Sequence, residues 1–285
     1  MTTTFRRARS EDVPACGRIC YDAFAAINRE HNFPPDFPNV EVATAVVSMM
    51  FAHPGMYAVV AERDGVPIGS NVLDERSAIA GIGPITVDPN VQNTGVGRQL
   101  MQQVVERARE RGFPGVRLVQ AAFHNRSLSL YTKLGFDPRE PLSCLQGAPL
   151  GLRLPGYDVR PCTDADVEAC NRVCAEVHGH TRDGELRDAI QMGAAMVVEH
   201  GGCIVGYASG VAFFSHAVAE SNVALEALIA AAPGFPGPGF LVPTRNAELL
   251  RWCLNHGLKV VQPMTLMSMG LYNEPRGAFL PSISF

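Results

Sequence analysis

The segment that most constrains this chain is a predicted strand, loop and helix start at residues 82–101. It reads IGPITVDPNVQNTGVGRQLM, and its β-branched run at residues 85–87 predicts a strand that ends at a polar loop. Gly95 and Gly97 have no Cβ, so an anionic ligand can approach the backbone closely there. The first N–H groups of a helix lack intrahelical acceptors, and the macrodipole adds about half a positive charge. The segment therefore predicts a site for a phosphorylated ligand.

The glycine spacing excludes two familiar phosphate-binding motifs. A dinucleotide fingerprint needs a third glycine, but Gln99 and Leu100 follow Arg98, and the Gly-Lys-Ser/Thr of a P-loop is absent. What remains is Q-x-x-G-x-G at residues 92–97, after a strand that holds Pro84. Since prolines in strands are confined to edges and bulges, Pro84 predicts an irregular strand. An ordinary glycine-bearing helix start is the alternative interpretation of this motif.

A second motif, HNRSLSLYTKLGF, follows at residues 124–136. Between the two motifs, apolar residues recur with a period of 3.6 from Val96 to Arg111, which predicts an amphipathic helix that Gly112 ends. Taken together, the two motifs and their separation resemble those of the GNAT N-acetyltransferase superfamily. The resemblance covers roughly residues 5–140.

This resemblance implies an α/β (α+β) fold with a mixed, mostly antiparallel central sheet flanked by helices. In this family a splayed central strand holds the pantetheine arm of acetyl-CoA, the co-substrate. The resemblance places the following residues at the coenzyme: Ile85, Val87, Gln92, Asn93, Thr94, Gly95, Val96, Gly97, Arg98 and Asn125. It implies that the backbone N–H of Val87 or Ile85 polarises the thioester carbonyl.

Tyr131 is the candidate general acid, because the resemblance places its hydroxyl near the CoA sulfur. A phenol with an ordinary pKa of about 10 stays protonated at neutral pH and can donate to the departing thiolate. The alternative is a tyrosine that only packs its helix against the core.

The general base is less well determined. Glu75 is the candidate, because it and Asp74 follow a predicted strand at residues 70–73 and precede the central strand. Exposed turn positions are the alternative interpretation for both. Weaker candidates are His31, His53, His124, His216 and Glu220. A partly deprotonated amine could also lose its proton to water alone.

The sequence repeats itself. One stretch aligns identical residues at equal spacing: Arg6, Asp12, Val13, Ala15, Cys16, Arg18 and Cys20 with Arg160, Asp166, Val167, Ala169, Cys170, Arg172 and Cys174. A second stretch aligns Ala58, Val60, Glu62, Gly65 and Gly69 with Ala195, Val197, Glu199, Gly202 and Gly206. We therefore predict two tandem GNAT-like domains: residues 1–146 bind acetyl-CoA and catalyse, residues 147–156 are a linker rich in glycine and proline, and residues 157–285 form the second copy.

The second copy departs from the family pattern where the chemistry would occur. Residues 216–222, HAVAESN, stand where Q-x-x-G-x-G should be, and Tyr131 has no counterpart. The prolines in residues 233–239 remove N–H donors that a phosphate would need. We expect a degenerate copy that completes a substrate cleft or an oligomer interface. Its apolar end, residues 279–285, is expected to dock against the body or a partner.

Composition restricts partners and location. With a formal net charge of −4 and neither half strongly basic, nucleic acid is not an expected partner. No apolar stretch of about 18 residues predicts a membrane span, and no apolar region follows the first arginines as in a signal peptide. The 8 cysteines include no C-x-x-C pair, so we expect buried reduced thiols, no metal site and a cytoplasmic location.

These observations predict an acetyl-CoA-dependent N-acyltransferase whose second substrate is an amine of an unidentified, small-molecule acceptor. A non-catalytic acyl-CoA-binding sensor or scaffold is the alternative, because the second copy shows that such chemistry can be lost. A homodimer is compatible with the sequence, which leaves the oligomeric state open.

Overall fold

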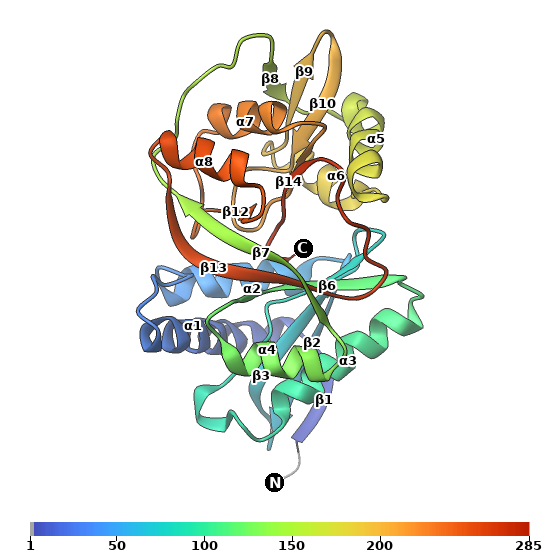
Figure 1. The fold of residues 1–285 in the computed structure, drawn as a ribbon. Coiled ribbons are helices and arrows are strands. Elements are labelled where there is room, and N and C mark those ends of the chain that lie inside the picture. The colour runs from blue at the N-terminus through green and yellow to red at the C-terminus, as the bar shows by residue number, and fades with distance from the viewer. Residues whose placement is uncertain (1–2, 285) are drawn as a thin grey trace.

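The computed structural model describes residues 3–284 and contains two sheets with helices packed on both (Figure 1). We refer to residues 3–146 as the first half and to residues 157–284 as the second half. The helices of the first half are α1 (Val13–Glu30), α2 (Val40–Ala52), α3 (Val96–Glu110) and α4 (Asn125–Lys133). Its strands are β1 (Thr3–Arg7), β2 (Met56–Arg63), β3 (Val66–Asp74), β4 (Ala80–Ile82), β5 (Thr86–Val87), β6 (Gly115–Ala121) and β7 (Asp137–Gln146).

The second half repeats the chain order of these elements, except that it has no counterpart of β5 and ends with an additional strand, β14. Its helices are α5 (Val167–His178), α6 (Asp183–Gln191), α7 (Asn222–Ala231) and α8 (Ala247–Asn255). Its strands are β8 (Asp158–Pro161), β9 (Met196–His200), β10 (Cys203–Ala208), β11 (Ala217–Ala219), β12 (Phe240–Pro243), β13 (Lys259–Gly270) and β14 (Ala278–Leu280). Short 3-10 turns lie at η1 (Ser10–Asp12), η2 (Pro89–Val91) and η3 (Asp164–Asp166).

Both sheets are mostly antiparallel, which confirms the predicted fold class. The larger sheet has the order β1-β2-β3-β4-β6-β13-β7-β12, with β5 paired to β3, and the smaller one has the order β14-β11-β10-β9-β8. Among the described strands, the pair of β4 and β6 is parallel and the other pairs are antiparallel.

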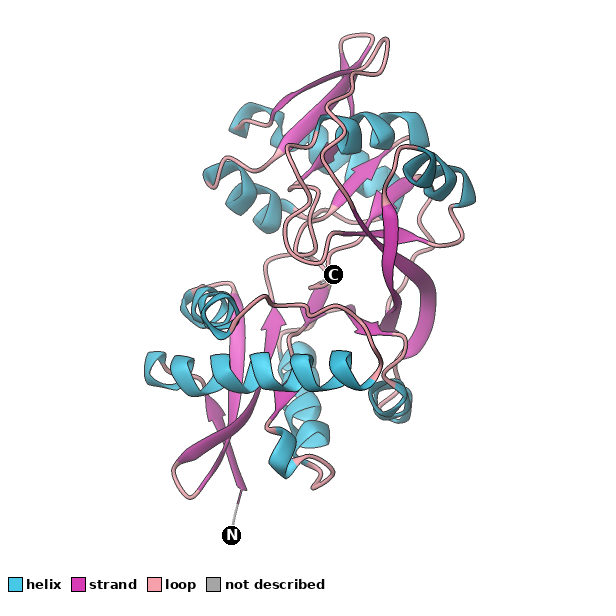
Figure 2. Cartoon of the chain, turned by 90° about the vertical axis from the view of Figure 1, so that its left-hand side faces the viewer, coloured by secondary structure: helices cyan, strands magenta, loops and turns pink. Residues whose placement is uncertain are grey.

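The two halves exchange strands at the centre of the larger sheet. Strand β13 lies between β6 and β7, and β7 lies between β13 and β12. Strands β6 and β12 are equivalent in the two halves, and so are β7 and β13. The order β6-β13-β7-β12 is therefore symmetric: it reads the same from either end when equivalent strands are exchanged. Each half inserts one strand into the other. Figures 1 and 2 show the two long strands side by side across the middle of the molecule.

A partly buried ion-pair set confirms the internal repeat. In the first half, the Arg6 guanidinium donates to both carboxylate oxygens of Asp12 at 2.8 Å and to Glu62 at 2.7 Å. The second half repeats this set at the aligned positions, with 2.8 Å to the aspartate and 2.9 Å to the glutamate: Arg160, Asp166 and Glu199. In both halves the aspartate lies just before the first helix and the glutamate on the second strand.

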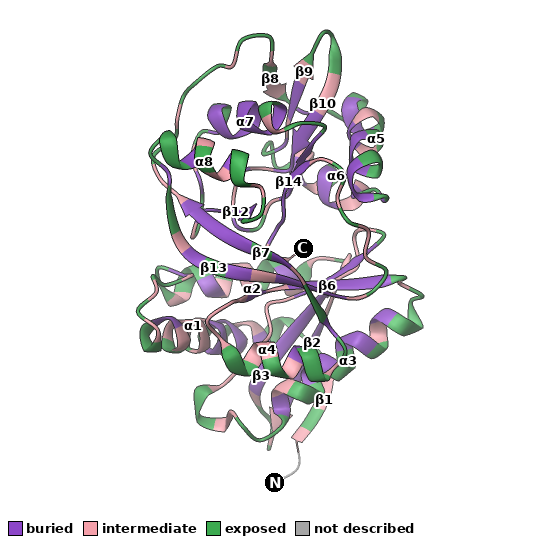
Figure 3. Cartoon of the chain, in the orientation of Figure 1, coloured by how far each residue is buried: buried purple, intermediate pink, exposed green. Residues whose placement is uncertain are grey.

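The helices of the first half cover opposite faces of its sheet. Val59 of β2 packs with Leu100 of α3, whereas Val60 packs with Cys16 of α1. This difference follows from the alternation of side chains along a strand. The central strands are therefore buried on both faces (Figure 3), and α1 and α3 are held on either side of the region described below.

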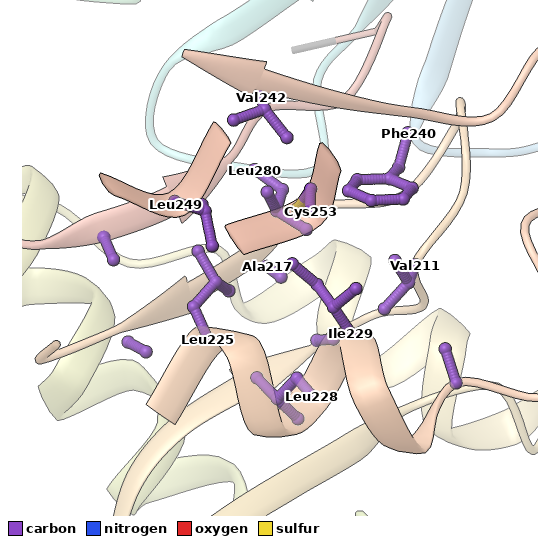
Figure 4. Packing of buried hydrophobic residues seen from close by; sticks show 14 of the residues in the cluster. Val211, Ala217, Leu225, Leu228, Ile229, Phe240, Val242, Leu249, Cys253 and Leu280 are labelled. Atoms are coloured by element: carbon purple, nitrogen blue, oxygen red, sulfur yellow. The ribbon is translucent and has the colours of Figure 1, made fainter. Parts of the chain in front are cut away.

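The C-terminal tail docks against the body of the chain, as predicted for its described residues 279–284. Strand β14 pairs with β11, Leu280 is 1% exposed, and the Ile283 N–H donates to the Phe213 carbonyl at 2.8 Å. Leu280 packs in a core cluster beside Phe240 (Figure 4). The predicted burial of all cysteines is wrong at one position, because Cys203, the first residue of β10, is exposed. Within residues 3–284, no helix combines the length and apolar character that crossing a bilayer requires.

Candidate active site

A cavity of about 890 Å³ lies on the first half and is closed on one side by the second. Its walls come from α1 and the loop after it, from β4 to β6, from the amino end of α3 and from α4 along its length. The second half contributes side chains of the loop after β10, of β13 and of the tail: Phe213, Phe214, Gln262, Met264, Ile283 and Ser284.

A gap between two strands forms the middle of this cavity. Strand β4 pairs with β6 only at Ala80 and Gly81, and β5 pairs with β3 but not with β6. The strands therefore separate after Gly81, where the chain passes Gly83 and Pro84. The Asp88 N–H donates to the Ile68 carbonyl on β3 at 2.9 Å. Because N–H directions alternate along an extended strand, the Val87 N–H points away from β3, towards the gap.

The amino end of α3 is open to this gap. Its N-cap, Gly95, adopts φ of 88°, and no side chain caps the first turn. Such a backbone favours glycine, because a Cβ is strained in the left-handed region. The preceding loop is fixed by Arg126 of α4, whose guanidinium donates to Gln92 Oε1 at 2.9 Å and to Asn93 Oδ1 at 3.2 Å. The Gln92 amide in turn donates to the Val87 carbonyl at 3.3 Å. Free N–H groups and two arginines, Arg98 and Arg126, thus line one end of the cavity.

The predicted coenzyme residues come together in the structure, with one exception. The following line the cavity: Ile85, Val87, Gln92, Asn93, Gly95, Val96, Gly97, Arg98 and Asn125. Thr94 does not, because its hydroxyl donates to the Val91 carbonyl at 2.8 Å and closes the turn before α3. Asn125 is the first residue of α4, beside Arg126.

Tyr131 lines the cavity from α4 and is 7% exposed. Its ring packs edge-on against Phe136, with 6.4 Å between the ring centroids. Burial raises the pKa of Tyr131 to about 12, against a smaller opposite effect of a hydrogen bond with Ser127. The phenol is therefore neutral throughout the physiological pH range and can donate a hydrogen bond into the cavity.

Glu75 lies outside the cavity lining. Its two carboxylate oxygens accept hydrogen bonds from Arg107 at 2.7 and 3.1 Å, and Arg111 lies 3.8 Å away. Because its carboxylate is paired with Arg107 and does not line the cavity, we do not assign Glu75 the role of base.

The candidate histidines occupy structural positions. His124 lines the cavity, but its ring caps α4 by accepting from the Ser127 N–H at 3.3 Å, and burial lowers its pKa. His53 pairs with Asp188, and the His31 ring packs at a tilt against the Phe123 ring, with 5.3 Å between the ring centroids. His216 is buried in the second half, 3.1 Å from His178 between ring nitrogens, and does not reach the cavity. Glu220 also lies outside the cavity lining.

Asp36 is a cavity residue that the sequence did not single out. It lies in the loop between α1 and α2, and burial raises the pKa of its carboxyl. The Gln262 amide of β13 donates to Asp36 Oδ1 at 3.1 Å, which partly opposes this shift. One sequence signal could have identified Asp36: it is a single carboxylate within an apolar, proline-rich run, FPPDFP.

Residues 22–136 match the model of the Acetyltransferase (GNAT) family. Mycothiol acetyltransferase from Nocardia farcinica is 37% identical over 65 residues, which span 23% of this chain and 22% of that protein. The chain thus matches about a fifth of the length of this curated relative.

Two solved structures share the fold over nearly the whole chain. A provisionally assigned acetyltransferase from Pyrococcus horikoshii superimposes with a TM-score of 0.75 at 18% identity, covering 97% of this chain and 94% of that one. A tandem GNAT protein from the clavulanic acid biosynthesis pathway superimposes with a TM-score of 0.56 at 14% identity, covering 94% of this chain and 98% of that one. The tandem arrangement predicted from the internal repeat is therefore confirmed at the level of the fold.

Proposed function

We propose, from the premise that this chain belongs to the GNAT acetyltransferase family through residues 22–136, that it moves an acetyl group from acetyl-CoA to the amine of a small-molecule acceptor. One observation carries the proposal. A single cavity joins the open amino end of α3, the gap between β5 and β6, and the Tyr131 side chain. The open amino end of α3 suits a pyrophosphate. The gap suits an extended pantetheine arm, and the Tyr131 hydroxyl suits a thioester sulfur.

The residues at the gap can stabilise the charges that acetyl transfer develops. The Val87 N–H, which points into the gap, can donate to the thioester oxygen as negative charge forms on it. The Tyr131 hydroxyl can donate to the sulfur as the C–S bond breaks. A phenol with a pKa of about 12 is a weaker acid than a thiol, whose ordinary pKa is about 8.5. Tyr131 therefore acts here by hydrogen bonding to the leaving thiolate, and not by complete proton transfer.

The proposed role of the second half is to complete the acceptor side of the cavity. Phe213 and Gln262 line the cavity from the second half, whereas the arginines that line it belong to α3 and α4. We propose that the second half binds no coenzyme of its own, because β14 occupies the position beside β11 where a second gap would open.

The test follows free CoA thiol while the protein is mixed with acetyl-CoA and a panel of amines. Tyr131→Phe should slow turnover by about 10²-fold, because it removes the donor to the sulfur, while coenzyme affinity stays within about twofold. Tyr57→Phe is the matched control: this tyrosine contacts Arg7 and Arg107 away from the cavity and should keep the wild-type rate.

Two results would contradict the proposal in different ways. Equal turnover by wild-type protein and Tyr131→Phe would remove the role of the phenol but leave acetyl transfer intact. Tight binding of acetyl-CoA without transfer to any amine would instead favour the acyl-CoA-binding sensor or scaffold.

A further inference from the structure

The charged residues that line the cavity divide by element. The basic ones, Arg98, Arg126 and Lys133, all belong to α3 and α4. The acidic ones are Glu30 at the end of α1 and Asp36 in the loop after it, and the described lining residues of the second half carry no charge. Since the open amino end of α3 suits the phosphates of the coenzyme, the lining from α1, the loop after it and the second half is left for the acceptor and favours a cationic group. We call this lining the acidic side.

Asp36 carries a partly buried carboxyl group on this acidic side. Its carboxylate accepts from Gln262 at 3.1 Å, and no described residue forms an ion pair with it. The titratable groups that face it are the thiols of Cys20 and Cys144, and burial raises the pKa of both to about 12, so both stay neutral. A buried carboxylate without a cation is unfavourable, and a ligand that brings an ammonium group would relieve this cost.

Neighbouring polar atoms extend this site. The Gln262 side chain is 2% exposed and its Oε1 atom has no hydrogen-bond partner in residues 3–284. Asn28 of α1 lies next to Asp36, is equally buried, and also lines the cavity. An alkylammonium group has three N–H donors, and the oxygens of Asp36, Gln262 and Asn28 are three acceptors on the acidic side.

The walls around these oxygens are apolar and largely aromatic. They comprise Phe24, Phe37, Phe213, Phe214, Met264 and Ile283. The rings of Phe24 and Phe37 pack edge-on at 5.8 Å between centroids, and those of Phe213 and Phe214 do the same at 5.8 Å. Among the described lining residues, the lysine and the arginines belong to α3 and α4, and α1, the loop after it and the second half supply none to pair with an acceptor carboxylate.

We infer that Asp36, held by Gln262 of the second half, receives the ammonium group of the acceptor and removes one of its protons, and that the acceptor is a small amine with an apolar body and no carboxylate. The inference rests on the proposed acetyl transfer and specifies its acceptor site. The two halves then share one substrate: the first supplies the carboxylate and the second supplies the amide that orients it.

The Asp36 carboxylate takes one proton from R–NH3+, directly or through one water, which frees the nitrogen lone pair. That pair attacks the thioester carbonyl carbon and forms the C–N bond, and the C–S bond then breaks with its electron pair going to sulfur. The nitrogen loses a second proton, which the CoA thiolate takes up. The products are the acetamide and CoA thiol, and protonated Asp36 releases its proton to solvent.

The test uses pairs of acceptors that differ by one carboxylate: 2-phenylethylamine against L-phenylalanine, tryptamine against L-tryptophan, and 3-methylbutylamine against L-leucine, with spermidine as a polar amine. Wild-type protein should acetylate the amine of each pair with kcat/KM at least about 50-fold above that of the amino acid. Any of these amino acids, or spermidine, preferred over every apolar amine would overturn the acceptor class and leave acetyl transfer standing.

The role of Asp36 is tested by Asp36→Asn, which keeps the shape of the side chain. Its kcat/KM for the best apolar amine should fall at least about 100-fold, while the dissociation constant of CoA stays within about twofold. The remaining rate should rise with pH until the free amine itself is deprotonated, because the variant has no base. Asp22→Asn, on the solvent side of α1, is the control and should keep the wild-type profile.

The outcomes separate the two proposals. A wild-type rate and pH profile in Asp36→Asn would overturn the role of Asp36 alone. Gln262→Leu provides a second measurement: it should raise KM for the amine more than it lowers kcat, because it removes an orienting contact. If wild-type protein transfers acetyl to no amine at all, the proposed function itself fails.

Discussion

The same gap is open in the first half and filled in the second. Beside the central strand of the first half, β5 and β6 separate around a cavity. At the corresponding place in the second half, β14 pairs with β11 and contacts β12, and its Leu280 packs with Phe240 and Val242 (Figure 4). The same arrangement of strands thus leaves a ligand-sized cavity in the first half, whereas in the second half strand β14 fills the corresponding space.

The helix starts beside the two gaps differ in charge as well. The caps of α4 and α8, His124 and Asn246, each accept from the N–H three residues later, which aligns the two helices. Two residues after these caps stand Arg126 in the first half and Glu248 in the second. Arg126 holds the loop before α3, whereas Glu248 accepts from Asn222, the first residue of α7, at 2.8 Å. Ser221 also caps α7, which leaves fewer free N–H groups for an anion than the uncapped α3. A few side chains therefore decide whether this fold presents an anion site.

Leu280→Ala tests whether the tail fills the second gap as a core element. The substitution leaves a cavity in a cluster where Leu280 is 1% exposed, so the free energy of unfolding should fall by about 3 kcal/mol. Ile85→Ala, in the wall of the open gap, should cost less than about 1 kcal/mol because its side chain is only half-buried. Urea denaturation measures both. Equal losses would mean that the two gaps do not differ in packing.

Acid should destabilise the second half before the first. Burial holds the pKa of His178 and His216 well below its ordinary value and lowers the pKa of His180 to about 4. The unfolded chain, with histidine pKa values of about 6.5, binds more protons in this window, so stability is present above about pH 6.5 and is lost as the pH falls towards 4. His180 alone accounts for about 2 kcal/mol at pH 5.

Hydrogen exchange at pH 7 and pH 5 would locate this loss. Amides of β10 and β11 should lose protection at the lower pH while those of β2 and β3 keep it. Uniform loss in both halves would contradict the assignment. His256→Gln, at an exposed histidine, is the control and should leave the pH dependence unchanged.

Arg126→Glu gives the first half the charge that the second half carries at the aligned position. It should weaken CoA binding by about tenfold or more, because it removes the contacts that fix Gln92 and Asn93 and places an anion beside the phosphates. Isothermal calorimetry measures the affinity. Arg109→Glu, an equal charge change on the exposed side of α3, should alter it by less than about twofold at physiological salt. If both variants weaken CoA binding equally, the effect comes from net charge alone and not from the position of Arg126.

Local patterns predicted the parts of the site that lie close together in the sequence. The helix expected from Val96 to Arg111 runs from Val96 to Glu110, and the glycine motif lies at its open end as expected. Glu75 was chosen from its position after a strand, but its partner Arg107 lies on a helix 32 residues later, which no local pattern indicates. Asp36 was missed for the same reason, because its environment depends on Gln262, 226 residues away. The exchange of β7 and β13 could not be predicted either. The hydrophobic pattern of a strand indicates which of its side chains are buried, but not which strand pairs with it.

The crossed strands described above also remove any hinge. Since β7 and β13 are hydrogen-bonded to each other along most of their length and each continues into the other half, the two lobes cannot rock apart without breaking a ladder in the middle of the molecule. Substrate entry and product release then depend on the smaller elements that line the cavity, such as the loop between α1 and α2. The relative position of the two halves, and with it the shape of the cavity walls that they share, stays fixed through the catalytic cycle.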